Sequence, residues 1–299
     1  MDNFEVHGKP RTEGREAESQ MDVKQRLRSI YASIWVGWEI ESNWTDPFIF
    51  IGLQIIRPLA STLLFPLLYI VGMNFTGQPV DAEYLSYIFI GTAFLTPYIL
   101  AAEAGGTIVA QDRERYGVMK SIYITSSSLT TYFFGRFLAI AAISLVSTLF
   151  STIISYMFIV YAVGHQLQIN LSNPLYTLTA LASLYIGSLS IFYLLPSINF
   201  LTNKLQWSLT YYFLGLLYLL GDILFPVQSL NPFAAPFKYI LPINQALNSM
   251  RASLGMNVEA NTLYAFFISS VWVAFSFYIF KKAVREARAR GLLDKIGWW

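Results

Sequence analysis

The chain contains no cysteine and only two histidines among its 299 residues. The lack of cysteine excludes disulfides, iron–sulfur clusters, thiolate nucleophiles and cysteine-based zinc sites. The histidines, His7 and His165, stand far apart with no partner residues around them. No HExxH, GxSxG or P-loop motif is present, so the residues predict neither hydrolytic catalysis nor P-loop nucleotide binding. We therefore expect no enzyme activity, metal or cofactor in this chain by itself.

Charged residues are also scarce. They make up 13% of the sequence, whereas apolar residues make up 55%. A soluble domain carries about 25% charged residues, enough to cover a globule with polar surface. This composition predicts an all-α integral membrane protein.

Six apolar segments reach the roughly 20 residues that a transmembrane helix needs. They are Phe48–Met73, Leu85–Val109, Phe137–Val163, Leu175–Leu201, Trp207–Phe225 and Thr262–Phe280. The fifth is the shortest and the most interrupted. No internal repeat relates the segments, which weighs against a carrier built from inverted repeats.

Lysine and arginine are concentrated before the first segment, between the second and third, and after the sixth. Because cytoplasmic connections carry the excess of basic residues, we expect a multi-pass protein of the cell membrane with both termini cytoplasmic. Residues 1–21 have no apolar signal-peptide core and are expected to be a disordered cytoplasmic tail. The six-span domain would cover residues 47–282, and residues 283–299 would form a basic cytoplasmic tail.

Residues 22–46 place apolar side chains at helical spacing, with basic residues and tryptophans among them. This pattern predicts an amphipathic helix that lies in the headgroup plane of the membrane. A helix packed on another soluble element is the alternative. Asp46 and Pro47 can then cap and start the first span.

Four prolines divide residues 226–261 into apolar pieces that are too short to span a membrane. Such backbone is tolerated at membrane depth only when it is buried in protein or lines a cavity. We expect a re-entrant or interfacial helical hairpin on the outer side, before the sixth span. A plain external loop is the alternative.

Residues 111–128, QDRERYGVMKSIYITSSS, form a charged island between two long apolar segments. Burying the four charged residues 112–115 in a bilayer core would be costly, so the island is expected to sit in water. A charged run, a glycine and an apolar–polar alternation indicate one short helix that another protein binds.

The island resembles the cytoplasmic loop of type-2 ATP-binding-cassette (ABC) exporter permeases. The resemblance rests on Arg113-Glu114-Arg115-Tyr116-Gly117, then VMKSIYITSSS, then Tyr132-Phe133-Phe134-Gly135-Arg136. A second stretch, LLGDILFPVQSL followed by YILPINQALNSMR, is similar to the same family. Two positions depart from the family pattern: a serine stands at 126 or 127 where a proline is frequent, and Asp222 stands where a small residue is more usual.

The resemblance implies that two permease subunits form a homodimer or heterodimer and bind two cytoplasmic ABC ATPase subunits, which hold the ATP and Mg²⁺. Residues Glu114 to Thr125 would be the coupling helix that docks on the ATPase, and the glycine would allow a sharp turn. The expected ATPase-contacting residues are Glu114, Arg115, Gly117, Val118, Met119, Lys120, Ile122 and Tyr123. Apolar anchors would hold the contact and charges would fix its register. A loop solvated by its charges is the alternative.

By analogy with the family, one face of the second and fifth spans would line the substrate path. The residues offered there are Thr92, Phe94, Thr96, Tyr98, Tyr211, Tyr212 and Tyr218. Aromatic side chains with a polar handle suit an amphiphilic, lipid-like or drug-like substrate. Contact with lipid or with other helices is the alternative for each.

Three ionisable residues, Arg57, Glu103 and Asp222, fall inside the spans. Such groups are functional candidates by default. Arg57 could extend its stem toward the interface, and Glu103 could pair with Arg57 or Arg136 or face a wet cavity. These alternatives stay open from sequence.

The expected function is the membrane-spanning subunit of an ATP-driven exporter, surrounded by membrane lipids and without a nucleic-acid partner. An ion- or proton-coupled secondary transporter or channel is the second possibility. A membrane-embedded enzyme is disfavoured because no paired catalytic groups are visible.

Overall fold

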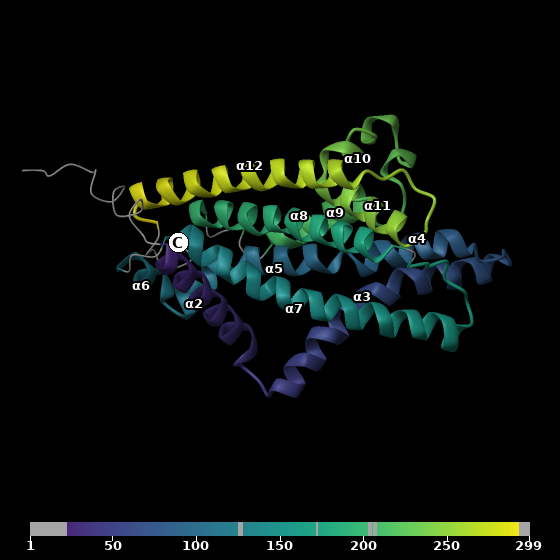
Figure 1. Ribbon diagram of the computed structural model, residues 1–299, viewed down its shortest axis with the longest axis horizontal. Helices are drawn as coiled ribbons and strands as arrows, with labels where there is room; N and C mark the ends of the chain where they lie inside the picture. The colour runs from purple at the N-terminus through teal and green to yellow at the C-terminus, as the bar shows by residue number, and fades with distance from the viewer. Residues whose placement is uncertain (1–22, 125–127, 172, 203–204, 206–207, 293–299) are drawn as a thin grey trace, which may run out of the picture.

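The computed structural model describes residues 23–124, 128–171, 173–202, 205 and 208–292. Within these ranges the chain is all-helical, and five helices are long and apolar enough to cross a membrane. They are Pro47–Thr76, Ala82–Arg115, Leu129–Val163, Pro174–Leu201 and Thr262–Ala289. The long helices run roughly along the longest axis of the molecule (Figure 1). This is the architecture of a multi-pass membrane protein.

The helices follow one another with short connections. Their bounds are α2 Val23–Ser42, α3 Pro47–Thr76, α4 Ala82–Ala93, α5 Thr96–Ala110, the π turn η1 Gln111–Arg115, α6 Val118–Ile124, α7 Leu129–Met157, the π turn η2 Phe158–Val163, α8 Pro174–Leu201, α9 Leu209–Leu220, α10 Phe237–Ile240, α11 Pro242–Ser253 and α12 Thr262–Ala289. The shorter 3-10 turns η3 Val227–Ser229 and η4 Pro232–Ala234 lie between α9 and α10.

The predicted start of the first span is confirmed. The Asp46 carboxylate accepts a hydrogen bond of 2.9 Å from the backbone N–H of Phe48, and Pro47 occupies the first turn of α3. Proline suits this position because the first helical N–H groups have no partner within the helix. In Figure 1, α2 and α3 meet at this corner in a V.

The second span, α4 and α5, is the most deeply buried of the five. It breaks at Phe94 and Leu95, directly before Pro97, because proline cannot continue the hydrogen-bond ladder of the preceding turn. Helix α5 lies against α7, α8 and α9. The cavity described below forms on its surface.

The fifth apolar segment is shorter as a helix than the expected span of residues 207–225. Its start at Trp207 lies outside the described residues, and α9 ends at Leu220, where the chain bends through residues 221–225. Twelve helical residues extend about 18 Å, whereas the hydrocarbon core of a bilayer is about 30 Å thick. Asp222 has a positive φ of 50°, which a continuing helix does not allow.

The proline-rich segment before the last span folds as a series of short helices. Each of its four prolines directly precedes or begins one of η3, η4, α10 and α11. Helix α11 is almost wholly buried and packs against α8, α12 and α4. The pieces before α11 are covered less: η4 and α10 contain no buried residue, so the re-entrant interpretation, which needs buried backbone, stays a prediction.

The ends of the chain differ from the expected domain limits. Helix α12 continues to Ala289, and Ala283, Val284 and Ala287 are buried in it, so the expected boundary after residue 282 falls inside a helix. The expected tail of residues 1–21 lies outside the described residues, as do residues 293–299.

Buried serines on α7 and α8 donate their hydroxyl protons to carbonyl groups of their own helix, three or four residues back. They include Ser147 to Ile143, Ser183 to Ala180, Ser190 to Gly187 and Ser197 to Tyr193. These hydroxyls are therefore satisfied without a partner on a neighbouring helix. Small side chains also let helices approach closely.

Candidate functional site: a buried ionic network and a polar cavity

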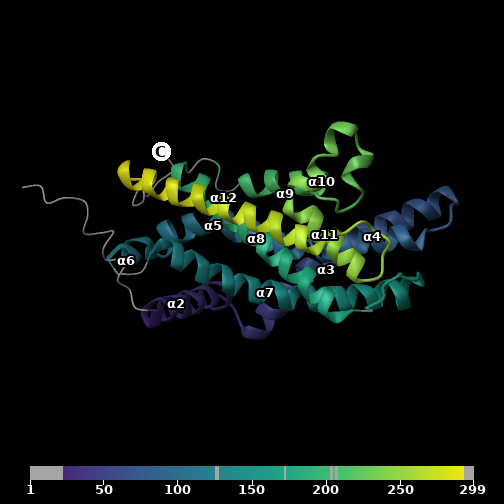
Figure 2. The same ribbon diagram turned by 45° about the horizontal axis from the view of Figure 1, so that its top comes forward.

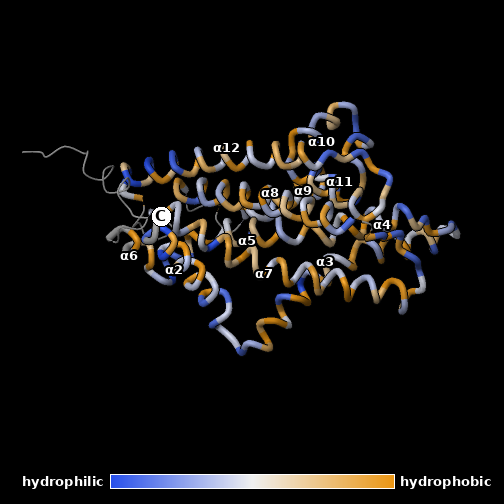
Figure 3. The backbone as a smooth tube through the Cα atoms, viewed as in Figure 1, coloured by the Kyte–Doolittle hydropathy of each residue, from blue (hydrophilic) through white to orange (hydrophobic). Residues whose placement is uncertain are grey.

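Hydrophilic residues gather at one end of the bundle, where α6, α2 and the C-terminal turns of α12 lie together. Figures 1 and 2 place these elements at one end of the long axis and α10 with the α3–α4 connection toward the other. In Figure 3 the last turns of α12 and parts of α2 are blue, whereas the middle of the long helices is largely orange. The elements that carry most of the lysine and arginine therefore share one end.

The charged island is two elements rather than one helix. Residues Gln111–Arg115 extend α5 as a π turn, and α6 begins at Val118 after Gly117, which has a φ of 62°. This left-handed conformation explains the glycine. The expectation that all four charged residues 112–115 sit in water is wrong for Asp112 and Arg113, which are buried in protein.

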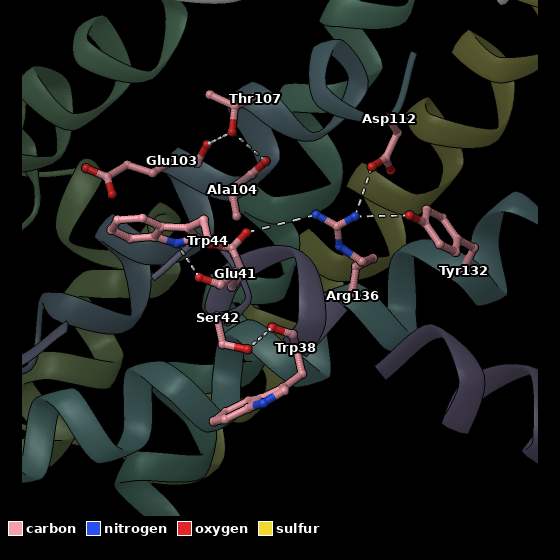
Figure 4. A network of polar contacts seen from close by, with 10 residues as sticks. All are labelled: Trp38, Glu41, Ser42, Trp44, Glu103, Ala104, Thr107, Asp112, Tyr132 and Arg136. Carbon is pink, nitrogen blue, oxygen red and sulfur yellow. Dashed lines mark hydrogen bonds and ion pairs between the residues drawn. The ribbon is translucent and has the colours of Figure 1, made fainter. Parts of the chain in front are cut away.

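Asp112 is buried because it has a cationic partner on the next span. Its Oδ1 lies 2.9 Å from Nη1 of Arg136, whose side chain is also buried. The same Nη1 donates a hydrogen bond of 3.0 Å to the Tyr132 hydroxyl, one turn earlier on α7. Figure 4 shows the three groups converging. The pair joins the end of the second span to the start of the third.

Helix α2 reaches this network through small residues. A Cβ at Gly135 would collide with the Cβ of Ser33 and would lie 2.9 Å from the Ile30 carbonyl oxygen, so only glycine allows this close approach. The approach brings the Glu41 carboxylate to 4.0 Å from Nη2 of Arg136 (Figure 4). Burial raises the pKa of the Glu41 carboxyl above its ordinary value, and the neighbouring Arg136 only partly opposes this.

The predicted ATPase-contacting residues divide into two sets. Met119 and Ile122 are buried in an aromatic cluster with Phe133 and Phe280, so they attach α6 to the spans and are not available as anchors for a partner. Arg115 and Gly117 are exposed, and Glu114 and Val118 are half-buried. The side chains of Lys120 and Tyr123 lie outside the described residues, as does Thr125.

A polar cavity of about 290 Å³ opens on the side of α5, between α2, α3, α7 and α9. Arg57 and Glu103 form an ion pair there, which was one of the alternatives that the sequence left open for Glu103. Its lining residues are Glu41, Gln54, Arg57, Leu100, Glu103, Ala104, Thr107, Gln111, Ile140, Ile143, Thr210 and Tyr211. Charged, polar and apolar side chains thus line the same cavity.

The predicted substrate-path residues of the second span are not on this cavity. Thr92, Phe94, Thr96 and Tyr98 are all buried inside the protomer. On the following turns, Leu100, Glu103, Ala104 and Thr107 of α5 and Gln111 of η1 line the cavity instead, so a substrate path at residues 92–98 stays a prediction.

The three tyrosines of the fifth span have different surroundings. Tyr211 lines the cavity although most of its side chain is exposed. Tyr212 is exposed beside it, and Tyr218 packs against Phe65 of α3 with ring centroids 5.4 Å apart. Only Tyr211 therefore combines with residues of the second span in one site.

At the opposite end, Asp222 belongs to a second buried network that sequence reasoning missed. Its carboxylate accepts hydrogen bonds from the Asn248 side chain, at 3.1 Å, and from the Val227 backbone, at 2.5 Å. The guanidinium of Arg251, on α11, donates to the carbonyl oxygens of Asp222, Ile223 and Tyr87 and lies 3.5 Å above the Tyr87 ring centroid.

A weak signal of this network was present in the sequence. Asn244, Asn248 and Arg251 recur at i, i+4 and i+7, which puts a polar stripe on one face of an otherwise apolar piece. This stripe fixes the bend after α9 against α11. The Asp222 carboxylate and the Arg251 guanidinium have partners within this chain, whereas Oδ1 of Asn244 is buried without one.

Within the described residues, no group of three or more histidine, aspartate or glutamate side chains is arranged to hold a metal ion. No protein-family model matches the chain, and no curated protein matches it.

Proposed function

We propose that this chain is the transmembrane subunit of an ATP-driven exporter of the type-2 ABC class, which moves an amphiphilic substrate with energy supplied by separate ATPase subunits. One observation carries the proposal. A short segment, η1 with α6, lies at one end of the bundle and presents an exposed turn at residues 115–117, and it is tied to the spans through Asp112–Arg136 and through the buried side chains of Met119 and Ile122. A rigidly tied projection transmits a push to the spans, whereas a solvated loop absorbs it.

The surface offered to an ATPase is the exposed part of this projection, Arg115 to Gly117 with Glu114 and Val118 at its edge. Its charges would set the register of docking, and its burial on binding would be modest. Because π turns inside helices are frequent at functional sites, the position of η1 directly before the turn supports the same role.

We propose six crossings of the membrane, with α9 as part of the fifth. Helix α8 ends near the α6 end, where Phe200 packs with Phe133 and Phe280. The residues after α9 contact Tyr87 and Arg251 at the opposite end. A path along α9 between these two ends supports a sixth crossing, in which the start of α2 and the end of α12 share the α6 side. By the basic-residue bias that side would be cytoplasmic.

The exposed aromatic residues of α2 support a position at the membrane surface. The helix buries small residues such as Ser33 against α7 and leaves Tyr31, Trp35 and Trp38 exposed. Exposed aromatic side chains of this kind suit the headgroup region. We propose that α2 lies there.

The test is co-purification and ATP hydrolysis. The chain is co-expressed with a candidate ABC ATPase, and the complex is expected to purify stoichiometrically and to show vanadate-sensitive hydrolysis. Glu114→Lys should weaken the complex because it alters the exposed projection, while thermal stability stays the same. Glu83→Lys, a matched change at an exposed residue in the first turn of α4, away from the projection, should have no effect. An unaltered complex for Glu114→Lys would contradict the docking role.

A proton- or ion-coupled transporter is the second candidate, favoured by the Arg57–Glu103 pair in the cavity. It predicts substrate movement in vesicles that follows a proton gradient and persists without ATP. Movement that requires ATP and the partner subunit excludes it.

The topology has its own test, because the absence of cysteine gives a silent background for labelling. Ser121→Cys on α6 and Gln228→Cys at the other end both replace exposed residues. A membrane-impermeant maleimide added outside cells should label the second and spare the first. Equal labelling of both would refute the six-span arrangement.

A further inference from the structure

The cavity on α5 carries an imbalance of charge. The ionisable side chains from its lining are the carboxylates Glu41 and Glu103 and the guanidinium of Arg57, together with the phenol of Tyr211. Arg136 lies behind Glu41, but it is 4.0 Å from that carboxylate and only 2.9 Å from Asp112. The positive charge of Arg136 is thus shared mainly with Asp112. Among the groups that line the cavity, the carboxyls therefore outnumber the guanidinium by two to one.

The positively and negatively charged side chains of the ion pair also differ in exposure. Glu103 belongs to α5, the helix enclosed by the bundle, and its side chain is 21% exposed. The Arg57 side chain is 64% exposed and comes from α3, which packs at the edge of the bundle. A long, exposed arginine side chain can leave its partner with little loss of packing, whereas the Glu103 carboxylate cannot follow it.

From this we infer that the cavity binds an organic cation, a protonated amine or quaternary ammonium carried on an apolar body. Arg57 occupies the place of the cation when the site is empty. Glu103 and Glu41 face the charge, Leu100, Ile140 and Ile143 face the apolar body, and Tyr211 offers a ring face to either. About 290 Å³ is at the lower limit of a small-molecule pocket, so it fits a small cation or the head of a longer amphiphile.

This inference names the substrate class of the proposed exporter and rests on that function only for the step of transport. Binding is a property of this chain alone. It is therefore measured on the purified full-length protein in an uncharged detergent, without ATP or ATPase.

The probe is labelled benzyltrimethylammonium, followed by equilibrium dialysis, and the comparison compound is benzylsulfonate, which has a similar shape and the opposite charge. Wild-type protein is expected to prefer the ammonium compound. Glu103→Gln should weaken its binding about tenfold, which is the effect of losing a partly buried charge partner. Glu83→Gln, at an exposed residue in the first turn of α4, is the control for a lost carboxylate away from the cavity and should leave binding unchanged.

Arg57→Gln gives the most discriminating result. If Arg57 competes with the ligand for Glu103, its removal should tighten ammonium binding severalfold, because the site no longer has to be vacated. If the cavity instead takes an anion, the same change should weaken binding and benzylsulfonate should be preferred. Either of these last two results overturns the inference.

A paired variant covers the chance that Glu103→Gln alone leaves Arg57 unpartnered and fails to fold. Arg57→Gln with Glu103→Gln keeps two neutral amides in place of the ion pair. It should lose the preference for the ammonium over the sulfonate compound, and a retained preference refutes the role of Glu103.

The failures of the two proposals are separable. Cation binding without vanadate-sensitive hydrolysis by any ATPase complex would contradict the exporter and leave the binding site standing. ATPase coupling without ammonium binding would overturn the binding site alone.

Discussion

Replacing Asp112 with asparagine should destabilise the protein far more than its position in a charged run implies. Asparagine keeps the size of the side chain but removes the negative charge 2.9 Å from the buried Arg136 guanidinium. Removing one partner of a buried ion pair costs about 3–5 kcal/mol because the other charge stays buried without compensation. Glu41, at 4.0 Å and half-buried, is too distant to replace it.

The magnitude translates into a measurable shift of the unfolding temperature. Unfolding entropy is about 2.1 cal/mol/K per residue, so for 299 residues it is roughly 0.6 kcal/mol/K. A loss of 3–5 kcal/mol then lowers the midpoint by roughly 5–8 °C. The assay is thermal unfolding of the purified protein in a mild detergent.

Glu114→Gln, two residues further on the same π turn, is the matched control and should change stability by no more than about 0.5 kcal/mol, as a surface substitution does. Adding Arg136→Met to Asp112→Asn should recover most of the loss, because an apolar chain leaves no stranded charge. A shift for Asp112→Asn as small as that of Glu114→Gln would refute the buried pair as the tie between the second and third spans.

Three further predictions use the same unfolding assay. Gly117→Ala should lower the free energy of unfolding by about 1–2 kcal/mol, because the φ of this residue is 62°. Gly117→Asn should lower it less, since asparagine tolerates the left-handed region. Equal losses for the two variants would contradict backbone strain at this position. Arg251→Lys should cost about 2–4 kcal/mol, because an ammonium cannot reach the carbonyl oxygens of Asp222, Ile223 and Tyr87 together. Arg290→Lys, at the exposed residue that caps the C-terminus of α12, is its control, and similar midpoints would count against the network. Because burial raises the pKa of Glu41, the folded protein holds that proton more tightly than the unfolded chain, and stability should fall as pH rises through the raised pKa. Glu41→Gln should remove this fall, and a midpoint whose pH dependence is unchanged would speak against it.

The sequence allowed the helical class, the approximate spans and the start of α3 at Pro47 to be predicted, because these depend on local rules. Apolar length indicates a span, Asp46 caps the next turn, and the glycine at 117 permits a turn. The sequence did not allow us to predict whether each apolar residue faces lipid or the protein interior. In a membrane protein, apolar residues point to lipid and to protein alike, so the pattern around Thr92 and Tyr98 could not show that both are enclosed.

The polar contacts were the hardest to foresee because they join distant parts of the chain. Asp112 pairs with Arg136 and Arg251 reaches the backbone of Tyr87. Sequence reasoning could judge the cost of burying Asp112 alone, which is high, but not the partner that lowers it. The same reasoning included Arg251 in the second stretch that resembles the permease family, but it gave no partner for its guanidinium.

The serine hydroxyls that bond within their own helices have a mechanical consequence. Since Ser147, Ser183 and Ser190 take no partner from a neighbouring helix, α7 and α8 can shear past their neighbours without breaking those hydrogen bonds. The charged networks at Arg136 and Arg251 lie toward opposite ends of the bundle and do cross between elements. Between these ends the cross-helix bonds include neutral groups such as Ser144 with Tyr185 and Ser269 with the Ser183 carbonyl. We therefore expect the two charged networks to hold the helices most firmly, which favours rocking of intact helices over their deformation.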